Sequence, residues 1–97
     1  MEETPAMDSV PIAISAQVSL YPLRHEYLNS VIDAAISLWC QRKLTVVPGA
    51  MSTLIAGEEA EVWAALRAAF AHAAQQCETI MVVTVSNACP SPLQEIP

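Results

Sequence analysis

The sequence predicts an α+β fold in which strands and helices follow one another in the order β-α-β-β-α-β. Residues 12–21 alternate apolar and polar side chains with the period of a strand. Two longer segments repeat apolar residues at steps of three and four, as one face of a helix does. Short runs rich in β-branched residues follow each helical segment, and turn residues bound them.

The first helix is expected over about residues 26–41. Its apolar stripe consists of Leu28, Val31, Ile32, Ala35, Leu38 and Trp39. Arg42 and Lys43 follow the stripe, where positive charge suits the negative end of the helix dipole.

Two strands are expected after this helix, at 44–47 and 51–57. Pro48 and Gly49 form a turn signal between them, and Gly57 ends the second. Strands this close in sequence form an antiparallel pair.

The second helix is expected to begin at the glutamates 58, 59 and 61, because acidic residues stabilise a helix N-terminus. Its stripe consists of Val62, Trp63, Leu66, Ala69, Phe70 and Ala73. Residues 79–87 then form the last strand.

This element order is that of the ferredoxin-like βαββαβ sandwich, a four-stranded antiparallel sheet with two helices on one face. We expect residues 1–10 to be a disordered N-terminal segment, 11–90 the domain, and 91–97 an irregular Pro-rich tail.

In such a sandwich one face of the sheet is left uncovered. The side chains of the first strand expected to face the helices are those of Ile12, Ile14, Ala16, Val18 and Leu20. The side chains expected on the uncovered face are those of Ser15, Gln17, Ser19 and Tyr21. The last strand adds either Met81, Val83, Val85 and Asn87 or Ile80, Val82, Thr84 and Ser86. A face of this kind is either solvated or buried in a dimer, or it borders a ligand pocket.

The composition and net charge of the chain argue for an oligomer and against a nucleic-acid-binding or membrane-spanning protein. The chain is 54% hydrophobic and only 14% charged, which is more apolar material than so small a domain hides, so we expect an oligomer. A net charge of −6 with four Lys and Arg cannot supply the basic stripe that nucleic acid needs. The apolar runs are strand-length, so no membrane span is expected, and the acidic N-terminus is unlike a signal peptide.

Cysteine usage indicates the compartment. Cys40, Cys77 and Cys89 are widely spaced and odd in number, which fits neither a disulfide framework nor a metal or redox pair. We read them as reduced thiols of a cytoplasmic protein.

Residues suited to catalysis are scarce, and we expect no enzyme, metal or cofactor. His25 and His72 are expected to be surface or partly packed residues. No nucleophile elbow and no cluster with metal-ligand spacing occurs in the sequence. Trp39 and Trp63 are expected in the core, whereas Tyr21 is expected to be partly exposed and could stack on a planar ligand.

Three segments, read together, resemble a known family. "VSLYPL" (18–23), "PGAMSTLIAGE" (48–58) and "MVVTVSNACP" (81–90), joined by helices of these lengths, look like the thiamine-binding, YkoF-like family. The resemblance implies a non-catalytic domain that binds thiamine or its hydroxymethylpyrimidine moiety. It also implies that a single-domain member assembles as a homodimer or homotetramer through its sheets.

The resemblance places Ser52, Thr53 and Asn87 within the matching motifs, which makes them candidate ligand-binding residues. Together with Gln17 and Ser19, they can donate and accept the hydrogen bonds that an aminopyrimidine needs. Tyr21 could stack on the ring or meet the cationic thiazolium with its π-face. With so few basic residues, the chain suits unphosphorylated thiamine better than its diphosphate.

Two other functions stay open at this point. One is an oligomerisation or regulatory domain without a ligand, whose open face is only a subunit interface. The other is a small dimeric ferredoxin-like enzyme, since the fold by itself does not choose a function.

Overall fold

The computed structural model describes residues 12–24 and 28–88. The elements are β1 (Ala13–Leu23), α2 (Leu28–Cys40), β2 (Thr45–Pro48), β3 (Thr53–Glu58), α3 (Glu59–Ala74) and β4 (Glu78–Ser86). Their order confirms the ferredoxin-like βαββαβ prediction, and each boundary lies within about two residues of its expected place. The expected terminal segments, His25 and Cys89 lie outside the described residues.

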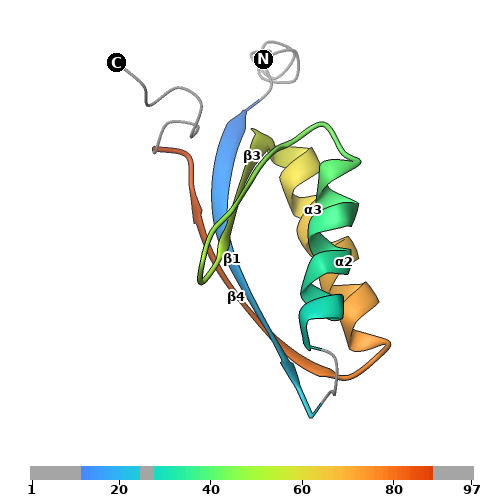
Figure 1. The fold of residues 1–97 in the computed structure, drawn as a ribbon. Helices are drawn as coiled ribbons and strands as arrows, with labels where there is room; N and C mark the ends of the chain where they lie inside the picture. The colour runs from blue at the N-terminus through green and yellow to red at the C-terminus, as the bar shows by residue number, and fades with distance from the viewer. Residues whose placement is uncertain (1–11, 25–27, 89–97) are drawn as a thin grey trace, which may run out of the picture.

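The four strands form one antiparallel sheet in the order β2-β3-β1-β4. Both helices cover the same face of this sheet, and the opposite face carries no described element (Figure 1). The expected two-layer sandwich is therefore confirmed, with one face of the sheet uncovered. We call this uncovered side the open face.

β1 divides its side chains between the two faces as its alternation predicts. Ile14, Ala16 and Val18 are buried beneath the helices, while Gln17 and Tyr21 are exposed on the open face. Ile12 differs from the prediction: it precedes the strand and is exposed, because the first strand residue is Ala13.

The pairing of β4 with β1 decides which of its two side-chain sets reaches the open face. Val83 is paired with Val18, and Val82 is paired with Ser19. Paired residues of an antiparallel sheet point to the same face. The open-face set of β4 is therefore Ile80, Val82, Thr84 and Ser86, and the other set packs toward the helices.

The core lies between the sheet and the two helices. Its largest fully buried side chains are Trp39, Ile55, Val31 and Val62. Trp39 is therefore a core residue as expected, but the prediction for Trp63 was wrong, because that side chain is 45% exposed.

The positions of the buried residues in α3 explain why Trp63 is exposed. These buried residues are Val62, Ala65, Leu66, Ala69 and Ala73. Trp63 and Phe70 are seven positions apart, so they share one flank of the helix, beside the buried stripe and not within it. The small Ala65 and Ala69 let the helix lie close to the sheet, and the larger aromatic side chains stay outside.

Charged residues near the helix ends include one ion pair that connects two elements. Glu59 and Glu61 occupy the first turn of α3, as expected for a helix N-terminus. α2 has no basic residue in its last turn, which differs from the role expected for Arg42. Arg42 instead forms an ion pair of 3.0 Å with Glu61, which joins the segment after α2 to the start of α3.

Candidate functional site

A pocket of about 110 Å³ lies between α2, β1 and the turn that joins β2 to β3. Its lining residues are Val18, Ser19, Leu20, Ile32, Ala35, Ile36, Trp39, Gly49, Ala50, Met51, Ser52 and Thr53. The pairing of the strands explains its position. β3 pairs with β1 only as far as Thr53 and Val18, so from Ser19 onward no described strand lies beside β1 on that side. The turn takes the place of a strand there and forms one wall of the pocket.

The inner wall comes from α2. Ile32, Ala35, Ile36 and Trp39 follow one another at helical steps of three and four, so they share one face of the helix. Trp39 is only 1% exposed, and its indole Nε1 donates a hydrogen bond of 2.8 Å to the carbonyl oxygen of Ala65 in α3. This bond connects Trp39, and with it this wall of the pocket, to α3.

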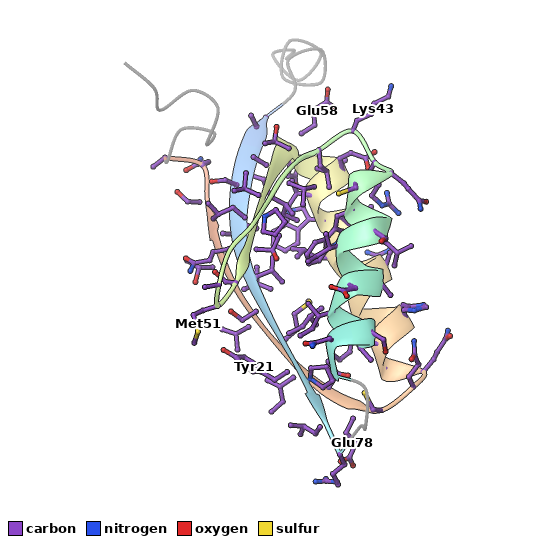
Figure 2. The ribbon with its side chains drawn as sticks, viewed as in Figure 1. Tyr21, Lys43, Met51, Glu58 and Glu78 are labelled. Carbon is purple, nitrogen blue, oxygen red and sulfur yellow. The ribbon has the colours of Figure 1, made fainter. Side chains whose placement is uncertain are left out.

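The outer wall is the β2–β3 turn, residues 49–52. The Gly49 amide donates a 2.8 Å hydrogen bond to the Ser52 carbonyl, and Pro48 is paired with Thr53 across the strand ends. A Cβ atom at Gly49 would lie 2.8 Å from that same carbonyl oxygen, so glycine permits this close approach. Met51 stands at the tip of the turn, 85% exposed, on the side of the sheet away from the helices (Figure 2).

Two side chains of β1 fasten this turn from the open face. Gln17 Nε2 donates to the Ser52 hydroxyl at 3.1 Å, and the Ser19 hydroxyl donates to the Met51 carbonyl at 3.4 Å. Three of the expected ligand-binding residues therefore bond to the turn or lie within it. These hydrogen bonds give Gln17 and Ser19 a structural role on the outward side of the strand.

Thr53 is the polar side chain buried in the core of the described residues, with 7% of its surface exposed. It lies on the helix side, because it is paired with the buried Val18. Its hydroxyl makes no hydrogen bond to any residue that the structure describes, and Thr53 is one of the residues that line the pocket. A buried hydroxyl without a partner is costly, so it favours any ligand that bonds to it.

None of the lining residues is ionisable. Trp39, aliphatic residues and three hydroxyl-bearing residues line a small space. Such a lining suits a flat, neutral, hydrogen-bonding ring. It offers no cation to a phosphate group.

The structure places the six expected site residues in three locations: at the pocket, further along β1, and after the end of β4. Ser19, Ser52 and Thr53 line the pocket, and Gln17 reaches it through Ser52. Tyr21 lies two residues beyond Ser19 along β1 and is half-exposed on the open face (Figure 2).

Asn87 is not brought to the pocket within one chain. It follows the last residue of β4, Ser86, which is paired with Ser15. Ser15 is four residues from the pocket residue Ser19 along β1, a separation of about 13 Å at the rise of a strand. Asn87 is exposed beyond this end of β4.

Sequence reasoning missed the wall formed by α2. Trp39 was expected only in the core, and Ile32 only in the apolar stripe. A residue in such a stripe produces the same periodicity whether it faces a side chain or an empty space, so the sequence carries no signal for this wall.

Other reactive groups lie elsewhere. His72 Nε2 is 3.0 Å from the side-chain nitrogen of Gln76 near the end of α3, and Cys40 and Cys77 are free thiols. In residues 12–24 and 28–88 there is no group of three or more metal-ligating side chains. No helix in the same ranges is long and apolar enough to cross a membrane.

Solved structures share this fold at low sequence identity. A protein from Streptococcus pneumoniae superimposes with a TM-score of 0.73 at 22% identity, covering 86% of this chain and 92% of that one. A domain of unknown function from Bacillus cereus gives 0.70 at 22% identity over 78% of this chain and 76% of its own. A Thermotoga maritima protein, provisionally assigned to thiamine biosynthesis or salvage, gives 0.68 at 17% identity over 75% and 81%.

No match was found among curated proteins. The sequence nevertheless matches the YKOF-related family over residues 13–92. The match spans all six elements and the pocket between them. The chain therefore belongs to the YKOF-related family.

Proposed function

We propose that this protein binds thiamine or its hydroxymethylpyrimidine moiety, that it acts as an oligomer, and that it catalyses no reaction. Membership of the YKOF-related family supports a small-molecule binding role. The provisional assignment of the Thermotoga maritima protein points to thiamine-related ligands.

The pocket beneath the β2–β3 turn is the observation that carries this proposal. Its lining is neutral and includes Thr53, whose hydroxyl bonds to no described residue. An aminopyrimidine ring has nitrogen acceptors and an amino donor, and a threonine hydroxyl can meet either kind of group. The ring would also pack against the indole of Trp39, which forms part of the wall.

The charge of the molecule supports an unphosphorylated ligand. The net charge of −6 tolerates the cationic thiazolium, while the pocket lining holds no Arg or Lys for a diphosphate. Tyr21, exposed on the open face, could offer its ring to the cation in an assembled protein.

Self-association through the open face is the second part of the proposal. Five large apolar side chains on this face are at least about a third exposed, namely Tyr21, Val47, Leu54, Ile80 and Val82. The strand positions between them on the open face hold uncharged residues. The charged residues Glu58 and Glu78 lie at the strand ends. A broad uncharged face on so small a domain is typical of an interface.

The non-catalytic part is supported by where the titratable groups lie. The pocket contains no side chain that could move a proton near pH 7, and His72 lies on the exposed surface of α3, bonded to Gln76.

Calorimetric titration with thiamine, hydroxymethylpyrimidine and thiamine diphosphate tests the ligand. We expect saturable binding of the first two at one site per chain and weaker binding of the diphosphate. Tighter binding of the diphosphate would contradict the neutral pocket as the binding site.

A ligand-free oligomerisation domain is the second candidate, and the uncharged open face favours it equally. The same titration separates the two functions. If all three ligands fail to bind to a protein that light scattering shows to be oligomeric, the second candidate replaces the first.

A further inference from the structure

The pocket is too small to enclose the two-ring molecule thiamine, the larger of the ligands proposed above. Sites that enclose small organic ligands usually measure about 300 to 1,000 Å³. The volume here is about 110 Å³. A pocket of this volume encloses a two-ring molecule only if one wall moves outward.

The two inner walls are fixed. β1 is paired on one side with β4 along its length from Ser15 to Leu23. α2 carries the buried Trp39, whose indole is bonded to the Ala65 carbonyl. Moving either wall would break core packing or a buried hydrogen bond.

The β2–β3 turn is held much less firmly. Gly49, Ala50 and Met51 are exposed, and the turn closes on itself through the bond from Gly49 to Ser52. Among the described residues, the side chains of Gln17 and Ser19 bond the turn to the sheet. Since both bonds lie on the exposed side, breaking them would release the turn without breaking a buried hydrogen bond.

We propose that Gln17 and Ser19 are positioning residues that latch the β2–β3 turn over the pocket and so control ligand entry and exit without contacting the ligand. This inference rests on the proposed function for its ligand, but the latch itself is a property of the ligand-free protein. Gln17, expected from the sequence to contact the ligand, bonds to the turn in this structure.

The effect of losing one latch bond follows from its exposure. A single hydrogen bond of this kind changes an equilibrium by about two- to tenfold. The fraction of molecules with the turn open, and the rate constants for ligand entry and exit, should rise by that factor.

Quenching of Trp39 fluorescence reports on the latch without any ligand. The chain has two tryptophans, so Trp63→Phe, at an exposed site on α3, leaves Trp39 as the sole emitter. In this background we compare the acrylamide quenching constant of Gln17→Met with that of its parent. Methionine matches the length of glutamine but cannot bond to Ser52, so we expect a rise of about two- to tenfold.

Thr84→Val is the matched control. Thr84 is paired with Gln17 on the same open face, and its side chain bonds to no described residue of the turn. Its substitution removes an exposed hydroxyl without altering the latch, so the quenching constant should equal that of the parent.

A double-mutant cycle identifies the bond itself. Ser52→Ala should raise quenching as Gln17→Met does, and combining them should add nothing further. Additive effects would show that Gln17 does not act through Ser52, and an unchanged quenching constant in Gln17→Met would overturn the proposal.

Stopped-flow measurement with thiamine completes the test. We expect both the association and the dissociation rate constants to rise in Gln17→Met, and a rise in the dissociation rate constant alone would identify Gln17 as a ligand contact. If thiamine does not bind while quenching still rises, the latch stands and the proposed ligand is wrong.

Discussion

Val82 and Val83 are neighbours in β4 but lie on opposite faces of the sheet. Val82 is paired with Ser19 on the open face and is 52% exposed, whereas Val83 is paired with the buried Val18 and packs against the core. The same substitution at these two positions should therefore have different consequences.

We expect Val83→Asp to unfold the protein, because a carboxylate placed against the core costs about 3 kcal/mol or more. Val82→Asp should leave the melting temperature of the subunit nearly unchanged but dissociate the oligomer, since the charge lies within the proposed interface. Light scattering gives the mass and circular dichroism the melting curve. A folded Val82→Asp variant with wild-type mass would show that this strand is not in the interface.

The two tryptophans form a second matched pair. Trp39→Phe removes a buried hydrogen bond and leaves a void, so the free energy of unfolding should fall by about 2 kcal/mol. Trp63→Phe should change it by no more than about 0.5 kcal/mol, because that side chain is nearly half exposed. Urea unfolding measures both. Equal losses would mean that Trp63 is buried, as the sequence alone had indicated.

The Arg42–Glu61 ion pair should contribute modestly to stability. Both side chains are about one third exposed, so Glu61→Gln should lower the free energy of unfolding by about 0.5 to 1 kcal/mol at low salt. Glu59→Gln, in the same first turn of α3, removes a similar charge without breaking this pair. The difference between these two variants isolates the pair. It should shrink in 1 M salt, and a difference that persists there would exclude an electrostatic origin.

Thr53→Val should not destabilise the protein, although the residue is buried. Valine has nearly the same shape, and the lost hydroxyl has no partner among the described residues, so the free energy of unfolding should stay equal or rise by about 1 kcal/mol. Urea unfolding without ligand checks this. A clear loss of stability would mean that the hydroxyl is already satisfied and is not available to a ligand.

The fold could be predicted from the sequence because each element has its own periodicity. The alternation of β1 placed Ile14, Ala16 and Val18 under the helices, and the turn signal at Pro48 and Gly49 separated β2 from β3. The set of β4 that reaches the open face could not be chosen, because both sets are apolar and only the pairing with β1 distinguishes them.

The candidate site was predictable only in part. Polar residues of a short motif, Ser52 and Thr53, indicated the pocket, but the pairing of Gln17 with Ser52 depends on how the turn folds over β1. The exposure of Trp63 was also beyond sequence reasoning, since it depends on how closely the alanines of α3 approach the sheet.

The affinity of thiamine for the wild-type protein and for Thr53→Val, measured by calorimetry, tests the central claim most directly. If the ligand binds in the pocket beneath the β2–β3 turn, the loss of this hydroxyl should weaken binding about tenfold while the protein stays folded. Equal affinities of the two proteins for thiamine would contradict the assignment of this pocket as the binding site.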